Sequence, residues 1–320
     1  MAIRTLLLTL AAFLVFPAAA PAFQGYVQTV AEGATIAWGS GDLAVSRLLE
    51  PLAGGAESPS PLTLRKAVSN ARKQLLDTIL GIRIDAHSTV GSHLSEDAEL
   101  AARVRAVIQN SPLERPAMFA DSGEIRVTES LRGKLAELIL PTIIQFQSGI
   151  APKLSTSMEQ SLNFEGGEPE HVGSGIGTGG FTGVIVDARG LKITPALTPV
   201  IFGQDGQGAY GAFLVSRQSA IDKGVVAYAA TPDPQALRER VGDRPLTVKA
   251  LSAYGSWRTD LIISTSMARL VRAVMRSGEA VNDCRVVIVL DPPQPDSVLP
   301  EPSMPESGPD VKPVEEGGNA

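Results

Sequence analysis

The side chains best suited to bind a metal are two histidines with carboxylates near them in sequence. His87 and His93 lie close together, and Asp85, Glu96 and Asp97 flank them. Imidazole nitrogens and carboxylate oxygens are ligands that zinc accepts when they converge from rigid elements. The residues between the two histidines, Ser-Thr-Val-Gly-Ser, have the composition of a loop. The pattern favours a solvated loop, and a ligand- or metal-binding protein that uses this segment stays open as the alternative.

A glycine-rich string from Gly175 to Gly180 has the spelling of the dinucleotide-binding fingerprint. That fingerprint requires a preceding strand and a following helix whose N-terminus holds the pyrophosphate. Here loop-like residues precede the string, and the residues after it, Phe181 to Val186, are typical of a strand. The sequence also lacks a Gly-x-Ser-x-Gly elbow and a phosphate-binding lysine after a glycine loop. We therefore predict no catalytic, cofactor-binding or metal-ligating residue, and no enzymatic activity.

The sequence contains a single cysteine, Cys284, so no disulfide can form within the chain. It directly precedes an apolar run from Val286 to Leu290. This position favours a buried, unreactive thiol over a reactive or intermolecular one.

The most unusual run of residues is a predicted turn that follows a strand ending at Asp187. Gly190 allows a positive φ there, and Asp187, Arg189 and Lys192 cluster around it. One interpretation is a structured turn with a local ion pair. The other is a contact loop for a neighbouring subunit, because irregular loops on a rigid scaffold often carry recognition. We take Asp187, Arg189, Gly190 and Lys192 as the interaction candidates.

The first 22 residues have the pattern of a cleavable signal peptide. A basic start with Arg4 precedes an apolar stretch from Thr5 to Phe16, and Ala20-Pro21-Ala22 has the small residues that signal peptidase recognises. The apolar stretch is too short to span a bilayer, and no later stretch is long and apolar enough. We expect cleavage between Ala22 and Phe23 and a periplasmic protein without a transmembrane segment or an N-terminal lipid anchor.

Charge is concentrated at the C-terminal end of the chain. The net charge is −6, and the residues from Asp291 to Ala320 account for it with seven acidic side chains and one lysine. The rest of the chain is close to neutral. This excludes the basic face that a nucleic-acid-binding protein needs.

The residues from 24 to 141 predict one α+β domain. Its clearest element is a helix that Ser60 caps, with Pro61 at its first position and Gly81 as its stop. The other expected elements are a hairpin from strands 25–30 and 34–39, a strand from Ile82 to Ala86, a helix capped by Ser95, and a hairpin around Asp121-Ser122-Gly123.

The rest of the chain predicts a linker, a second domain and a tail. Residues 142–180 are a glycine-rich linker, and residues 181–290 form a second, β-rich α+β domain. Its strands are expected at 183–188, 198–202, 225–230, 245–253 and 285–290, with a helix from 264 to 278. Residues 291–320 are acidic and proline-rich, which is typical of disorder. The fold class is therefore α+β, with two small domains.

Two stretches resemble known exported proteins. The helix with Ala67-x-x-x-Ala71-Arg72-x-x-Leu75-Leu76, followed by Gly81-Ile82-Arg83-Ile84-Asp85 and Ser122 to Thr128, resembles the exported domain of flagellar outer-membrane lipoproteins of the FlgP type. The run from Gly183 to Ile201, with two later segments, resembles a companion region in exported proteins of anaerobic, flagellated bacteria.

The resemblance implies a non-catalytic protein that assembles around the flagellar motor in the periplasm. The partners it implies are further copies of itself and envelope or flagellar motor proteins. The lipobox cysteine that tethers FlgP-type proteins to the outer membrane is absent at the expected cleavage site. Peripheral contact with that membrane is left open.

Overall fold

The computed structural model describes an N-terminal unit and a C-terminal unit of the chain. The predicted signal peptide, and most of the predicted linker and tail, lie outside the described residues, as does the Asp121-Ser122-Gly123 turn. The described residues are 23, 25–49, 60–114 and 124–142, which we call the N-terminal unit, and 180–276 and 278–293, which we call the C-terminal unit.

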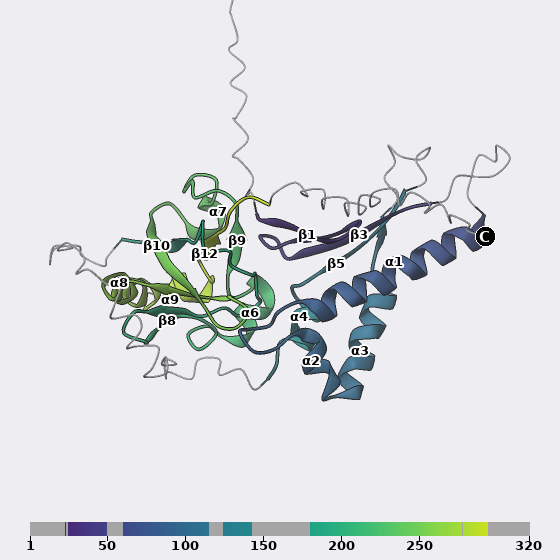
Figure 1. The fold of residues 1–320 in the computed structure, drawn as a ribbon, viewed down its shortest axis with the longest axis horizontal. Coiled ribbons are helices and arrows are strands. Elements are labelled where there is room, and N and C mark those ends of the chain that lie inside the picture. The colour runs from purple at the N-terminus through teal and green to yellow at the C-terminus, as the bar shows by residue number, and fades with distance from the viewer. Residues whose placement is uncertain are drawn as a thin grey trace, which may run out of the picture.

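An antiparallel sheet of five strands forms one layer of the N-terminal unit (Figure 1). The hairpin expected near the N-terminus is present, and β4 and β5 pair antiparallel, with Leu113 opposite Val127. The strands lie in the order β1 (Val27–Ala31), β2 (Ala34–Ala37), β3 (Asp42–Leu48), β5 (Glu124–Ser130) and β4 (Leu113–Glu114).

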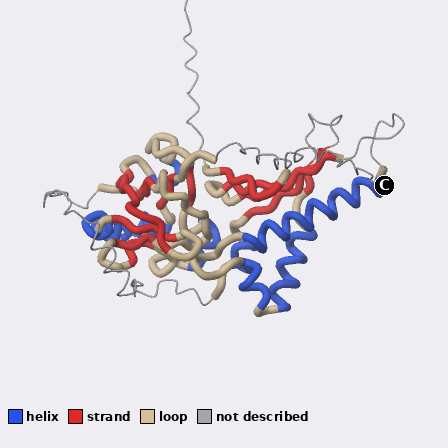
Figure 2. The backbone as a smooth tube through the Cα atoms, in the orientation of Figure 1, coloured by secondary structure: helices blue, strands red, loops and turns tan. Residues whose placement is uncertain are grey.

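Four helices form the second layer, below the sheet in Figure 2. The Ser60 hydroxyl accepts a hydrogen bond from the Thr63 backbone N–H at 3.1 Å, which confirms the predicted start of the longest helix. That helix buries Ala71, Leu75 and Ile79 and ends at Gly81, as expected. The helices are α1 (Pro61–Gly81), α2 (Val90–Ser95), α3 (Ala98–Gln109) and α4 (Lys134–Ile139).

Two sequence-based expectations in this unit are wrong. Residues 82–86 form no strand, because their backbone partners come from the following turn and from a loop of the C-terminal unit; Arg83 makes only isolated bridges, to Thr89 and Ala196. Ser95 is the last residue of α2 and caps no helix. The cap of α3 is Asp97, whose carboxylate accepts from the Leu100 N–H at 2.9 Å.

A mixed sheet of seven strands forms the C-terminal unit. Four neighbouring strands, β9, β12, β6 and β10, run parallel, and β11 and β8 are antiparallel to β10 and β7 respectively. The order is β8 (Gly208–Tyr210), β7 (Ile201–Gly203), β11 (Asp260–Ile263), β10 (Pro245–Tyr254), β6 (Gly183–Asp187), β12 (Val286–Val289) and β9 (Ala227–Ala229).

Both faces of this sheet are covered. The central strands β6 and β12 are almost continuously apolar and buried, as expected of parallel strands between two layers. On one side Val287 and Val289 pack with Leu237, Val241 and Phe23. The helices are α6 (Arg217–Lys223), α7 (Arg238–Val241), α8 (Thr265–Met275) and α9 (Gly278–Asn282), so the chain as described is an α+β protein. No helix among the described residues is long and apolar enough to cross a membrane.

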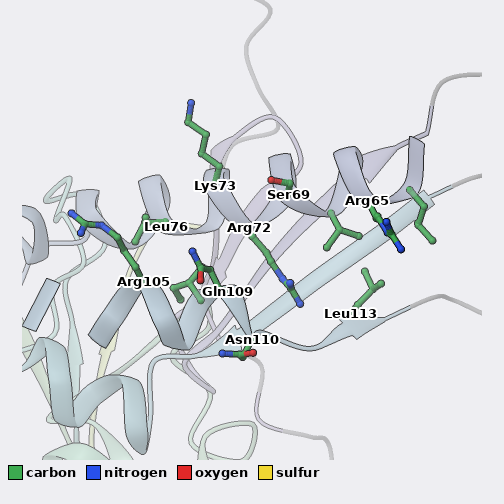
Figure 3. Close-up of a pocket in the computed structure, with 12 residues that line it drawn as sticks. Arg65, Ser69, Arg72, Lys73, Leu76, Arg105, Gln109, Asn110 and Leu113 are labelled. Atoms are coloured by element: carbon green, nitrogen blue, oxygen red, sulfur yellow. The ribbon is translucent and has the colours of Figure 1, made fainter. Parts of the chain in front are cut away.

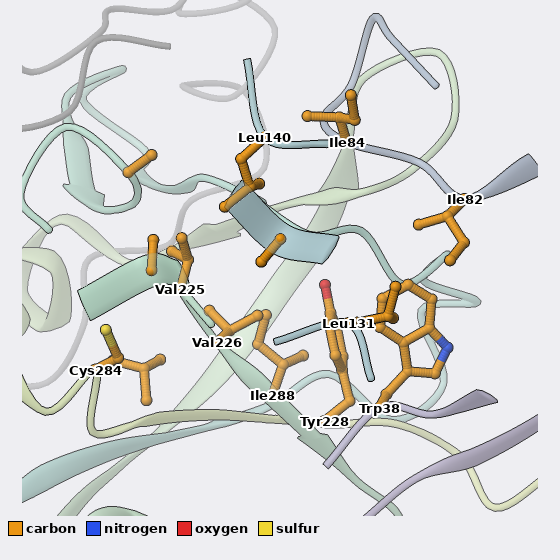
Figure 4. Packing of buried hydrophobic residues seen from close by; sticks show 14 of the residues in the cluster. Trp38, Ile82, Ile84, Leu131, Leu140, Val225, Val226, Tyr228, Cys284 and Ile288 are labelled. Atoms are coloured by element: carbon orange, nitrogen blue, oxygen red, sulfur yellow. The ribbon is translucent and has the colours of Figure 1, made fainter. Parts of the chain in front are cut away.

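The two units meet along a seam with a shared apolar core (Figure 4). Trp38 of the N-terminal unit packs edge-on against Tyr228 of the C-terminal unit, with ring centroids 5.6 Å apart. The Tyr26 N–H donates to the Tyr228 carbonyl at 2.8 Å, and Gly25 bridges to Ala229 at the edge of β9. Buried side chains of both units therefore form one continuous cluster.

A second part of the seam joins the turn after α1 to the loop before β7. Thr198 is buried, and both its backbone N–H and its hydroxyl donate to the Ile84 carbonyl at 2.8 Å. Close by, the Arg83 guanidinium lies 3.4 Å from the centre of the Trp257 ring, a cation–π contact. Polar as well as apolar contacts therefore hold the two units together.

Candidate functional site

The predicted turn after β6 is held by an ion pair within the turn itself. The Arg189 guanidinium donates to both carboxylate oxygens of Asp187, from Nε at 2.8 Å and from Nη2 at 2.7 Å. These hydrogen bonds hold the pKa of the Asp187 carboxyl below its usual range. The local ion pair that the sequence suggested is therefore present, and a contact with a neighbouring subunit stays a prediction.

Contacts from outside the turn fix its remaining residues. The Gly190 N–H donates to the Asp291 carboxylate at 2.8 Å, and Gly190 has a φ of +84°, which its missing Cβ makes easy. Lys192 also has a positive φ, and the Arg258 guanidinium donates to the neighbouring Leu191 carbonyl at 2.7 Å. The four interaction candidates therefore lie on one braced turn at the carboxyl end of β6.

The two histidines and the carboxylates near them are placed on different local structures. His87 is exposed on a turn in which the Asp85 carboxylate accepts the His87 and Ser88 backbone N–H groups, each at 2.8 Å. His93 lies in α2, beside a hollow that Glu96 and Asp97 also line. Within the described ranges, no three His, Cys, Asp or Glu side chains are gathered as a metal ion would need.

A groove lies between α1, the end of α3 and β4 (Figure 3). Its volume is about 790 Å³, and aliphatic side chains such as Val68, Leu76 and Ile108 form part of its wall. Arg65, Arg72, Arg105 and Lys73 line it, and none of its described lining residues is acidic. We call this hollow the basic groove.

The arginines of the basic groove differ in how well they are paired. Arg72 donates to the Ser111 carbonyl at 2.9 Å, but its Nε is buried and has no hydrogen-bond partner among the described residues. Arg65 and Arg105 are exposed, and neither makes an ion pair within the described part of the chain. The groove thus combines an apolar wall with uncompensated positive charge.

A second groove lies between α1 and the end of β3, with a volume of about 650 Å³. Leu48 and Leu62 line it and are 77% and 76% exposed, which is unusual for large aliphatic side chains. Two buried polar atoms at this groove, Arg47 Nε and Gln74 Oε1, have no hydrogen-bond partner among the described residues. We call it the leucine groove.

The sequence carried only a partial signal for the two grooves. The basic residues of α1 are readily seen to lie outside its buried stripe, but Arg105 comes from α3 and Leu48 from β3. Leu62 lies on the first turn of α1, off the stripe that Ala71, Leu75 and Ile79 continue. Leu62 is therefore the residue whose position in the sequence indicates an exposed apolar surface on α1.

Cys284 is buried at the seam, as its position before an apolar run predicted. Burial raises the pKa of its thiol, which lowers the fraction of reactive thiolate.

Arg240 lies near this thiol and donates to the Lys223 and Gly224 carbonyls at the end of α6, each at 2.8 Å. A Cβ on Gly224 would overlap the Arg132 guanidinium, so glycine is required where this arginine crosses between the units.

Comparison with known proteins gives one match, in the C-terminal unit. Residues 183–292 match the family model for the second domain of Treponema pallidum Tp0624. The matched stretch contains every strand of the seven-stranded sheet, and it includes the turn with Asp187, Arg189, Gly190 and Lys192. A search of curated proteins finds no match. About a third of the chain is therefore similar to a domain of a spirochaete protein.

Proposed function

We propose that this chain is a non-enzymatic, exported assembly protein, a self-associating periplasmic component of a flagellar motor or envelope complex. The observation that carries the proposal is the leucine groove. Leu48 and Leu62, from two different elements, are both exposed and line the same hollow. Clustered apolar surface of this kind is typical of a site that contacts another protein.

Two features of the sequence support the location and the kind of complex. The first 22 residues have the pattern of a signal peptide. The residues around Ala67 to Asp85 resemble FlgP-type flagellar lipoproteins, and α1 is the helix that carries this resemblance. In this proposal, copies of the chain associate through α1 and β3 on the solvent side of the leucine groove.

Sedimentation of the chain over rising protein concentrations tests the proposal. We expect dimers or larger species, and we expect Leu62→Glu to shift the population to monomer, because a carboxylate cannot be buried in an apolar contact without a partner. Leu251→Glu is the matched control, since Leu251 is also exposed, at 48%, but lies on β10 of the C-terminal unit. This control should leave the association unchanged.

Capture from envelope fractions provides the second arm of the test. The unmodified chain is used as bait, and a flagellar or envelope protein that Leu62→Glu no longer retains would support the proposal. Only monomer at high concentration, together with no envelope protein retained, would overturn it.

A further inference from the structure

We propose that the basic groove binds the acidic, proline-rich C-terminal segment of the same chain, residues 294–320. The basic groove and the leucine groove lie on neighbouring faces of α1, and Lys73 is the one described residue that lines both. The inference therefore goes beyond the proposed self-association and does not depend on it. It rests on the charge and shape of the groove and on the chemistry of this segment.

The groove has the charge to attract a carboxylate-rich peptide. Arg65, Arg72 and Arg105 line it, and no acidic residue is found among its described lining side chains. Arginine forms paired hydrogen bonds with carboxylates because its planar guanidinium matches their geometry. Arg65 and Arg105 are exposed and make no ion pair within the described part of the chain, so their guanidinium donors are open to such a ligand. An acidic segment therefore fits the donors that the groove presents.

Residues 294–320 have the complementary composition. They contain six acidic side chains and one lysine, with Val298, Leu299, Met304, Val311 and Val314 between them. The acidic side chains pair with the arginines, and the aliphatic ones match the wall that Leu64, Val68 and Leu113 contribute. Six prolines favour an extended conformation that loses little entropy when it lies in a groove.

The segment is long compared with the groove. Its 27 residues span up to about 90 Å when fully extended. The helix that forms one wall of the groove has 21 residues and is about 32 Å long. The segment, which follows the last described residue, Pro293, is therefore more than twice as long as this wall when extended.

Carbodiimide cross-linking of the full-length chain tests this proposal. The reagent joins a carboxylate to a lysine amine in direct contact. Lys73 already lines the groove, and Arg65→Lys supplies a second amine there while keeping the charge. We expect cross-links from the introduced lysine to carboxylates between Asp296 and Glu316, identified by mass spectrometry. The matched control is Arg269→Lys on the exposed face of α8, which should give none.

A charge reversal then separates groove binding from mere proximity. Adding Arg105→Glu should lower the cross-link yield by about fivefold, because one of the groove's cations becomes a repelling anion. Adding Arg103→Glu, on the same helix but outside the basic groove, should leave the yield unchanged. Salt at about 0.5 M should weaken the cross-link with Arg105 intact, because ions screen exposed charges.

Three results would overturn the proposal. The first is no cross-link to the tail, or cross-links instead to Glu159, Glu165, Glu168 or Glu170. The second is an equal loss of yield with Arg103→Glu and Arg105→Glu. The third, in a mixture of light and heavy nitrogen-labelled chains, is a cross-link that joins different copies, which would make a second molecule the occupant. This assay keeps Leu62 and the sedimentation assay keeps the groove arginines, so failure here is distinguishable from failure of the proposed self-association.

Discussion

Among the described residues, Asp260 is the most deeply buried carboxylic acid. It is 5% exposed at the start of β11, and its carboxylate accepts from the Val200 N–H at 3.0 Å and the Thr259 hydroxyl at 3.4 Å. Burial outweighs these hydrogen bonds and raises the pKa of Asp260 to about 6. An acid with a raised pKa in the folded state makes that state less stable when it ionises.

This raised pKa predicts how stability changes with pH. Between about pH 4 and pH 6 the folded chain binds a proton at Asp260 that the unfolded chain has released, so this group's contribution falls as pH rises. We expect Asp260→Asn to match the parent near pH 4 and to be more stable above pH 7, by on the order of 1–3 kcal/mol. Urea unfolding at several pH values measures this difference, and parallel curves for the two chains would contradict it.

At the scale of single elements, the start of α3 shows which of two candidate residues caps the helix. Ser95 and Asp97 are both residues that cap helices. Only the Asp97 side chain accepts a hydrogen bond from a backbone N–H in the first turn of α3, because α2 extends through Ser95. A cap is therefore fixed by where the preceding element ends.

Substitution at these two positions should have unequal effects. Asp97→Ala removes the acceptor of the Leu100 N–H and should lower the free energy of unfolding by about 1 kcal/mol. Ser95→Ala removes a hydrogen bond to the Ser92 carbonyl at an exposed site and should have a smaller effect, within about 0.5 kcal/mol. Chemical denaturation of both variants decides the matter, and equal losses would refute the assignment of the cap.

The elements with local signals were predictable, and those that depend on distant partners were not. Ser60, Pro61 and the apolar spacing of α1 lie within one segment, so its start and end follow from the sequence. The alternation of Ile82 and Ile84 also suggested a strand, but alternation reports burial and not pairing. Likewise, the basic groove joins α1 to α3 and β4, and no local pattern shows that arrangement.

At the scale of the whole molecule, both tryptophans of the chain lie on the seam. Trp38 contacts Tyr228, and Trp257 contacts Arg83, each across the boundary between the two units. Their fluorescence therefore reports separation of the units, whereas far-ultraviolet circular dichroism reports helices of which α1 is the longest. Because the buried core continues across the seam, we expect both signals to change at one urea midpoint.

A variant at the seam tests whether the two units unfold together. Thr198→Val removes the hydroxyl bond to the Ile84 carbonyl with little change in volume, and should lower the free energy of unfolding by about 1 kcal/mol. Both signals should move to the same lower midpoint. If the fluorescence change came first and the dichroism change stayed in place, the units would be unfolding independently.

The bridge between Gly25 and Ala229 constrains the order in which parts of the chain can fold. The first described residues add to the edge of β9, a strand roughly 200 positions later in the sequence. A chain that emerges from its N-terminus cannot make this pairing until most of its length is present. The segment that leads the chain is thus among the last to be fixed, and Trp38, which packs on Tyr228, acquires its final surroundings only at that late step.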